Sequence, residues 1–140
     1  MPMAGDHVAR LRRLGIFADL TEAELRDVAA EMDEQTFPEG VWVLRQGEPG
    51  IGLFIIVEGE VGVVIDDEER TTLATGSFFG EVSVLLDEPT TADIVVRKPL
   101  RCLAIPPDRA EAFLLAHPRV MYRMFQTEAR RLRTADPKRD

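Results

Sequence analysis

Residues 78–93 read FFGEVSVLLDEPTTAD, and this stretch decides how the rest of the chain is interpreted. Gly80 precedes a short apolar run, so the backbone N–H groups of a helical turn can approach an anion there. Glu81 follows directly, and its carboxylate can accept a hydrogen bond from a hydroxyl group. Two acids and a proline at residues 87–89 end the run. Alone this pattern is a weak indication of a small-ligand site, so its setting has to be considered.

Short apolar segments separated by turn residues lie on both sides of this stretch. Residues 53–57 and 61–65 are rich in branched side chains, and Glu58-Gly59-Glu60 between them predicts a tight hairpin turn with glycine at a positive φ. Further strands are predicted within residues 35–47, 71–74, 92–96 and 101–105. About eight short strands with glycine turns predict a double-sheet β jelly roll.

Helical patterns flank the strands. Thr21 is a good N-cap, and Glu24 three residues later completes a capping box in the first helical region. Asp108 is the expected N-cap of a helix that ends near Pro118, and an amphipathic helix follows. In this last helix apolar residues fall near one face, with a further methionine on the adjoining face: Met121, Phe125 and Leu132, then Met124.

The fold is therefore expected to be mainly β with flanking helices. We expect residues 1–140 to form a single domain, with N-terminal helices at 7–33, a β roll at 34–106 and C-terminal helices at 107–134. With 45% hydrophobic residues the chain can bury a core, and no apolar run reaches the roughly 20 residues of a membrane-spanning helix. The first fifteen residues lack the apolar segment of a signal peptide, and a single cysteine permits no internal disulfide. We expect a cytoplasmic protein that contacts no membrane.

Charge argues against a nucleic-acid partner, because the formal net charge is -8 and such proteins usually carry a basic surface. The basic residues gather only at the C-terminus: Arg130, Arg131, Arg133, Lys138 and Arg139. We interpret them as cations that complement the dipole of the last helix.

Catalytic chemistry is not expected. The two histidines, His7 and His117, lie in the terminal helical regions and are interpreted as solvated helix residues. Cys102 lies in a strand with no histidine nearby in sequence, which favours a buried structural thiol. We therefore predict no catalytic residue, no metal ligand and no cofactor.

Several motifs occur together in one order: LGIF at 14–17, FPEG at 37–40, RQGEPG at 45–50, FIIVEGEV at 54–61 and GSFFGE at 76–81. In this order they resemble the cyclic nucleotide-binding domain family, which includes the catabolite activator protein, the regulatory subunits of protein kinase A and the cyclic-nucleotide-gated channels. The resemblance extends from about residue 11 to about residue 133. It identifies residues 78–93 as the phosphate-binding cassette and implies a non-catalytic regulatory or sensor domain.

The resemblance also implies residue roles. The family's cassette glycine and the N–H groups after it hold the cyclic phosphate, which corresponds to Gly80, and its glutamate holds the ribose 2′-hydroxyl, which corresponds to Glu81. An arginine in a Pro-Arg-Ala-Ala/Ser-Thr stretch clamps the phosphate. Pro89 matches the proline, but Thr90 occupies the arginine position and Asp93 the last position. The ligand-binding residues implied are Phe79, Gly80, Glu81, Val82, Ser83, Pro89, Thr90 and Thr91.

The loss of the arginine predicts weak or absent binding of cAMP and cGMP. A charge-assisted hydrogen bond contributes roughly 1.5–3 kcal/mol, or about ten- to a hundredfold in affinity. Asp93 would add repulsion if it faces the phosphate, and residues 81–93 contain acids but no base.

Three alternatives stay open. In the first, the domain is an ordinary cAMP- or cGMP-binding module whose phosphate is held by Arg45, Arg70 or Arg97. In the second, it binds another small ligand. In the third, it is a ligand-free scaffold that forms a homodimer through the last helix. Transcription factors of the family carry a helix-turn-helix domain after that helix, whereas only residues 134–140 follow here; the protein acts without DNA, or this chain is part of a longer one.

Overall fold

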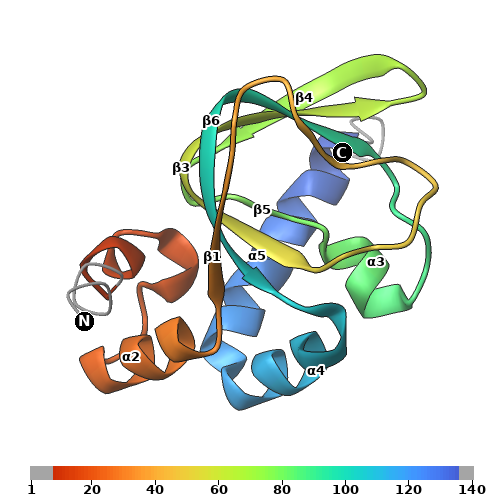
Figure 1. Ribbon diagram of the computed structural model, residues 1–140. Coiled ribbons are helices and arrows are strands. Elements are labelled where there is room, and N and C mark those ends of the chain that lie inside the picture. Colours follow the sequence, from red (N-terminus) through yellow and green to blue (C-terminus); the bar gives the residue numbers. More distant parts are fainter. Residues whose placement is uncertain (1–7, 136–140) are drawn as a thin grey trace.

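Two long antiparallel strands form the centre of the computed structural model, which describes residues 8–135 (Figure 1). Strands β3 (Leu53–Ile65) and β6 (Asp93–Ile105) pair along most of their length. β1 (Asp33–Phe37) and β2 (Trp42–Leu44) pair with β6, while β4 (Glu68–Ala74) and β5 (Phe78–Phe79) pair with β3. The six strands make one antiparallel sheet that curls into a jelly roll, as the sequence predicts.

The hairpin predicted at residues 58–60 is wrong, because β3 runs through this position without a turn. Gly59 has φ +108°, and the pairing with β6 shifts register on both sides of it. A Cβ atom on Gly59 would lie 2.3 Å from the carbonyl oxygen of Pro99. Glycine is therefore used for an irregularity that lets two strands approach closely. The break predicted between residues 96 and 101 is likewise absent, since β6 continues through Pro99, so the strands are fewer and longer than expected.

Alternating side chains of β3 and β6 build two hydrophobic cores. Ile55 and Leu103 belong to a core shared with the helices, whereas Ile56 and Cys102 face the interior of the roll. The buried thiol predicted for Cys102 is confirmed; burial, with the charge of Glu34, raises its pKa to about 12.

The N-terminal helices follow the sequence closely. A helical segment at residues 8–12 precedes the 3₁₀ turn η1 (Gly15–Phe17) and helix α2 (Glu22–Ala30). The capping box of Thr21 and Glu24 is confirmed, with each side chain accepting the other residue's backbone N–H. These elements pack with the C-terminal helices over the outer face of the sheet.

The C-terminal helices are α4 (Pro107–Ala116) and α5 (Pro118–Ala135). α4 begins two residues earlier than predicted: Pro106, not Asp108, is its N-cap and Pro107 its first residue, a position where proline's missing N–H costs nothing. His117, between the helices, is not solvated as predicted, because its Nε2 lies 2.7 Å from a carboxylate oxygen of Glu31 in the loop after α2. His7 lies outside the described residues.

Helix α5 has one anchored face and one open face. Arg123 donates two hydrogen bonds of 2.8 and 2.9 Å to Asp19, and Val120 and Met124 are buried. Four large apolar side chains remain exposed on α5: Met121, Tyr122, Phe125 and Leu132. Within residues 8–135, no helix is long and apolar enough to cross a membrane.

Candidate functional site

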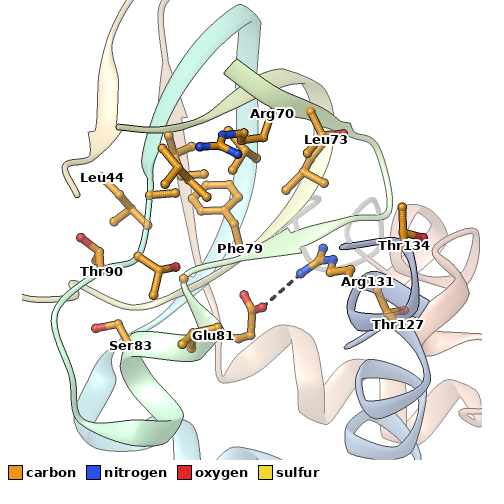
Figure 2. A pocket seen from close by; sticks show the side chains of 18 of the residues that line it. Leu44, Arg70, Leu73, Phe79, Glu81, Ser83, Thr90, Thr127, Arg131 and Thr134 are labelled. Atoms are coloured by element: carbon orange, nitrogen blue, oxygen red, sulfur yellow. Dashed lines mark hydrogen bonds and ion pairs between the residues drawn. The ribbon is translucent and has the colours of Figure 1, made fainter. Parts of the chain in front are cut away.

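A pocket of about 720 Å³ opens between the roll and the C-terminal half of α5 (Figure 2). Its apolar wall is Leu44, Val63, Ile65, Leu73, Phe79, Val82, Ala92 and Ile94. Polar side chains reach it from β4, from the cassette and from α5: Arg70, Thr71, Glu81, Ser83, Thr90, Thr91, Thr127, Arg130, Arg131 and Thr134. The volume suits a small-molecule ligand.

The structure places nearly all the predicted ligand-binding residues around this pocket. Residues 79–83, Thr90 and Thr91 line it, whereas Pro89 is exposed and lies outside the lining. Segments that are separate in sequence therefore meet at one cavity, although their roles toward a ligand remain predictions.

Gly80 lies at the start of the cassette and has a backbone conformation that favours glycine. Its φ of +86° lies in the left-handed region, and a Cβ atom there would lie 2.3 Å from the carbonyl oxygen of Gly52. Glycine is thus required where the chain leaves β5 and enters α3 (Glu81–Leu86). The ring of Phe79, which lines the pocket, stacks on the ring of Phe54 with centroids 5.0 Å apart.

Thr90, at the position where the family has arginine, is buried and bonded to the loop between β2 and β3. Its Oγ1 donates toward the carbonyl oxygens of Arg45 and Glu48. Its backbone N–H donates to the Glu48 oxygen at 2.9 Å, and its own carbonyl accepts from the Gly47 N–H at 2.8 Å. Thr90 therefore acts as a connection between the loop and the cassette.

Asp93 completes this connection. One carboxylate oxygen accepts the backbone N–H of Gln46 at 2.7 Å, the residue is buried, and it is not part of the pocket lining. The Asp93 carboxylate therefore faces the loop and not the pocket, so it does not contact a ligand there. Asp87 and Glu88 are exposed and also lie outside the lining, so of the cassette's acids only Glu81 faces the pocket.

Two of the three arginines considered as substitutes for the clamp lie elsewhere. The Arg45 guanidinium stacks 4.2 Å from the ring centroid of Trp42, and Arg97 is paired with Glu69 at 2.5 Å. Neither lines the pocket, whereas Arg70 on β4 does.

Sequence reasoning missed the arginines of α5. Arg130 and Arg131, interpreted as cations complementing the helix dipole, line the pocket. A signal was present, because the four pocket-lining residues of α5 recur at helical spacing: Thr127, Arg130, Arg131 and Thr134. Arg133 belongs to the same helix but does not line the pocket, and Lys138 and Arg139 lie outside the described residues.

Arg131 joins the helix to the cassette. It donates to a carboxylate oxygen of Glu81 at 3.1 Å, to Glu128 at 3.2 Å and to the carbonyl oxygen of Phe78 at 2.8 Å. Its guanidinium also lies 4.4 Å from the centroid of the Phe78 ring. Figure 2 shows Arg131 reaching from α5 to Glu81, the residue expected to hold a ribose hydroxyl.

Glu81 is chemically unusual. Burial raises its pKa from an ordinary 4.5 to about 8, the neighbouring carboxylate of Glu128 adds to the rise, and the charge of Arg131 opposes it. The charged groups of the lining are the guanidinium groups of Arg70, Arg130 and Arg131 and the one carboxyl group of Glu81, so cations outnumber acids in the pocket of a protein with net charge -8.

A metal site is not indicated among residues 8–135, which contain no group of three or more histidine, cysteine, aspartate or glutamate residues arranged to hold an ion.

Comparison with known proteins identifies related sequences. The family model described as cyclic nucleotide-binding domain matches residues 34–117. The cGMP-dependent protein kinase of Plasmodium berghei is 34% identical over 116 residues, which cover 83% of this chain and 14% of the kinase. The corresponding kinase of Eimeria tenella is 32% identical, with 85% of this chain and 12% of the kinase covered. This chain therefore spans a small part of the length of these curated relatives.

Solved structures show the same fold. The catabolite activator protein of Thermus thermophilus superposes with a TM-score of 0.78 at 26% identity, covering 88% of this chain and 60% of that one. A regulatory subunit of a cAMP-independent protein kinase A from Trypanosoma brucei gives 0.79 at 22% identity, covering 90% and 46%. A variant of that subunit with glutamate-to-alanine, threonine-to-arginine and valine-to-alanine exchanges is bound to cAMP; its TM-score is 0.77 at 24% identity, covering 90% and 47%.

Thr90→Val should lower the free energy of unfolding by roughly 1–3 kcal/mol, because it removes a buried hydroxyl that donates to carbonyl oxygens of the β2–β3 loop while preserving side-chain shape. Thr91→Val is the matched control, since Thr91 is the exposed neighbour of the same type, and it should change stability by less than about 0.5 kcal/mol. Urea unfolding measures both. Equal effects of the two substitutions would contradict a structural role for Thr90.

Glu81 should make stability depend on pH. The folded protein keeps a proton on Glu81 up to about pH 8, whereas an ordinary glutamate releases it near pH 4.5. The contribution of Glu81 to the free energy of unfolding is complete below pH 4.5 and is lost as the pH rises to about 8. The loss is a few kcal/mol at most, since one pKa unit corresponds to about 1.4 kcal/mol. Wild type should therefore lose stability relative to Glu81→Gln between pH 5 and pH 8 in urea unfolding. Glu39→Gln, at an exposed acid, should follow wild type; a pH-independent difference for Glu81→Gln would show that its proton is not retained on folding.

Proposed function

Because the chain belongs to the cyclic nucleotide-binding domain family, we propose that it is a non-catalytic regulatory sensor domain in which cAMP and cGMP bind weakly. The observation that carries this proposal is the burial and hydrogen bonding of Thr90. At the position of the family's phosphate-clamping arginine, a short neutral side chain is buried and committed to the β2–β3 loop.

The remaining cassette groups give a cyclic phosphate little compensation. Ser83 Oγ donates to the carbonyl oxygen of Glu88 at 2.5 Å, so its proton is already in use. Backbone N–H groups beyond Gly80 remain as donors, but no guanidinium comes from the cassette. Loss of one charge-assisted hydrogen bond weakens binding by about ten- to a hundredfold.

The Glu81 contact adds a second cost. A ribose hydroxyl approaching Glu81 must share or displace Arg131, which also holds Glu128 and the Phe78 carbonyl. Binding is thus linked to the position of α5, because the same helix supplies Arg131. A regulatory domain needs such a link between ligand and a movable element.

Self-association through α5 is a second proposal, and the exposed apolar side chains of α5 favour it. Phe125 is 69% exposed and Leu132 is 58% exposed, while the opposite face of the helix is buried against the rest of the domain. Isolated exposed apolar residues are ordinary, but several on one helix favour an interface. The acidic net charge opposes association, although salt screens exposed charges beyond about 8–10 Å.

Calorimetric titration with cAMP and cGMP tests the ligand proposal. We expect wild-type dissociation constants on the order of a hundred micromolar or weaker. Thr90→Arg should tighten binding by about tenfold or more, because it returns a bidentate donor to the phosphate. Asp93 is kept in this variant, since Asp93→Thr would remove the acceptor of the Gln46 N–H. The exchange is of the same kind as one of the three in the cAMP-bound Trypanosoma variant.

Thr72→Arg is the control for net charge, because Thr72 is exposed on β4 and does not line the pocket. Its affinity should equal that of wild type. A submicromolar dissociation constant for wild type would overturn the proposal, and a folded Thr90→Arg protein with no gain would show that the missing arginine is not what limits binding.

Light scattering at physiological salt tests self-association. Wild type should give a dimer mass at tens of micromolar, and Phe125→Glu should give a monomer with an unchanged melting temperature. Ile51→Glu, at a comparably exposed apolar residue in the loop before β3, should remain dimeric. A monomeric wild type would remove the interface, and an unfolded Phe125→Glu would assign Phe125 to the core.

A further inference from the structure

The family's phosphate-binding arginine comes from the cassette. In this pocket the arginines come instead from the opposite side, from β4 and α5. Arg70 comes from β4, and Arg130 and Arg131 come from α5; together they form the basic rim of the pocket. In Figure 2 Arg70 lies above Phe79 and Arg131 lies beside α5, while Ser83 and Thr90 lie across the cavity. An anionic group would therefore find its cations on the β4 and α5 side.

Two arginines of the basic rim, Arg70 and Arg130, make only weak interactions with other protein groups. Arg70 lies 3.5 Å from Glu68, and its side chain is 49% exposed. Arg130 donates a 3.3 Å hydrogen bond to the hydroxyl of Thr127, a neutral partner on its own helix. Arg131, by contrast, holds three oxygen acceptors of the protein. Arg70 and Arg130 are thus the groups with capacity to bind an anion.

The polar groups on the cassette side are already used within the protein. Thr90 Oγ1 and Ser83 Oγ both donate to backbone carbonyl oxygens, and Asp93 caps the β2–β3 loop from outside the pocket. Besides Glu81, Thr91 and the backbone N–H groups after Gly80, this side is apolar, with Phe79, Val82 and Ile94 among the lining residues. The pocket is therefore amphipathic, with a hydrocarbon interior and a cationic rim.

We propose that the ligand of this pocket is a small amphiphilic anion whose aromatic or alkyl body lies against the apolar wall and whose carboxylate or phosphate binds Arg70 and Arg130. The inference rests on the proposed function and names its ligand class. Apolar burial supplies affinity, and the two guanidinium groups select for negative charge. This selection for anions is local to the pocket, because the protein as a whole carries a net charge of -8 and repels anions.

Calorimetry with three matched probes tests this assignment: 2-naphthoate, 2-naphthyl phosphate and the neutral 2-naphthamide. Wild type should bind at least one of the two acids about tenfold or more tighter than the amide at 50 mM salt, with the difference shrinking at 500 mM salt. The ratio between the two acids then distinguishes a carboxylate from a phosphate ligand. Arg70→Gln and Arg130→Gln should each weaken binding of the preferred acid by roughly three- to tenfold, and the double variant should bind acid and amide equally.

Arg97→Gln is the matched control, because Arg97 is a partly exposed arginine of the same roll that pairs with Glu69 outside the pocket. It should bind the acids like wild type. Failure of both acids to bind at 1 mM, equal affinity for acid and amide, or preference retained in the double variant would overturn the assignment. These results are independent of the cAMP and cGMP titrations, so this inference and the proposed function can fail separately.

Discussion

Hydrogen bonds from Thr90 and to Asp93 hold the β2–β3 loop against the start of β6, and the geometry of the pocket depends on them. Asp93 accepts the Gln46 N–H, Thr90 donates its hydroxyl to the loop, and backbone bonds with Gly47 and Glu48 complete the connection. A cassette that relied on an arginine would need a bound anion to balance that charge. Here the neutral Thr90 hydroxyl and the hydrogen-bonded Asp93 carboxylate hold the loop, so the loop and the cassette are ordered without a ligand.

Helix α5 is fastened at two places, which makes it part of the site. Arg123 pairs with Asp19 near the N-terminal helices, and Arg131 reaches Glu81 and β5 at the pocket. A ligand that changes the Arg131 contacts changes the support of the helix, and the exposed face of α5 would transmit that change to a partner. Ligand affinity and helix position are thereby coupled through the Arg131–Glu81 hydrogen bond, in either direction.

Local patterns in the sequence predicted the jelly roll, the capping box at Thr21 and the cassette segment. The errors arose where one local pattern serves two structures. Gly59 satisfies a hairpin turn and also a register shift within a long strand, and only the proximity of Pro99 distinguishes them. The partners of Thr90 and His117 lie 45 and 86 residues away in sequence, so no local pattern could reveal them. Arg131 was visible as part of a helical stripe, but the cavity it faces is created by β4 and the cassette.

Backbone hydrogen exchange at Gln46, Gly47 and Thr90 tests most directly whether the loop–cassette connection replaces a ligand-dependent clamp. Each of these N–H groups donates within the connection. We expect strong protection of these N–H groups in the ligand-free protein and no further protection on addition of 10 mM cAMP. Fast exchange without ligand, followed by protection when cAMP is added, would show instead that the connection forms only around a bound phosphate.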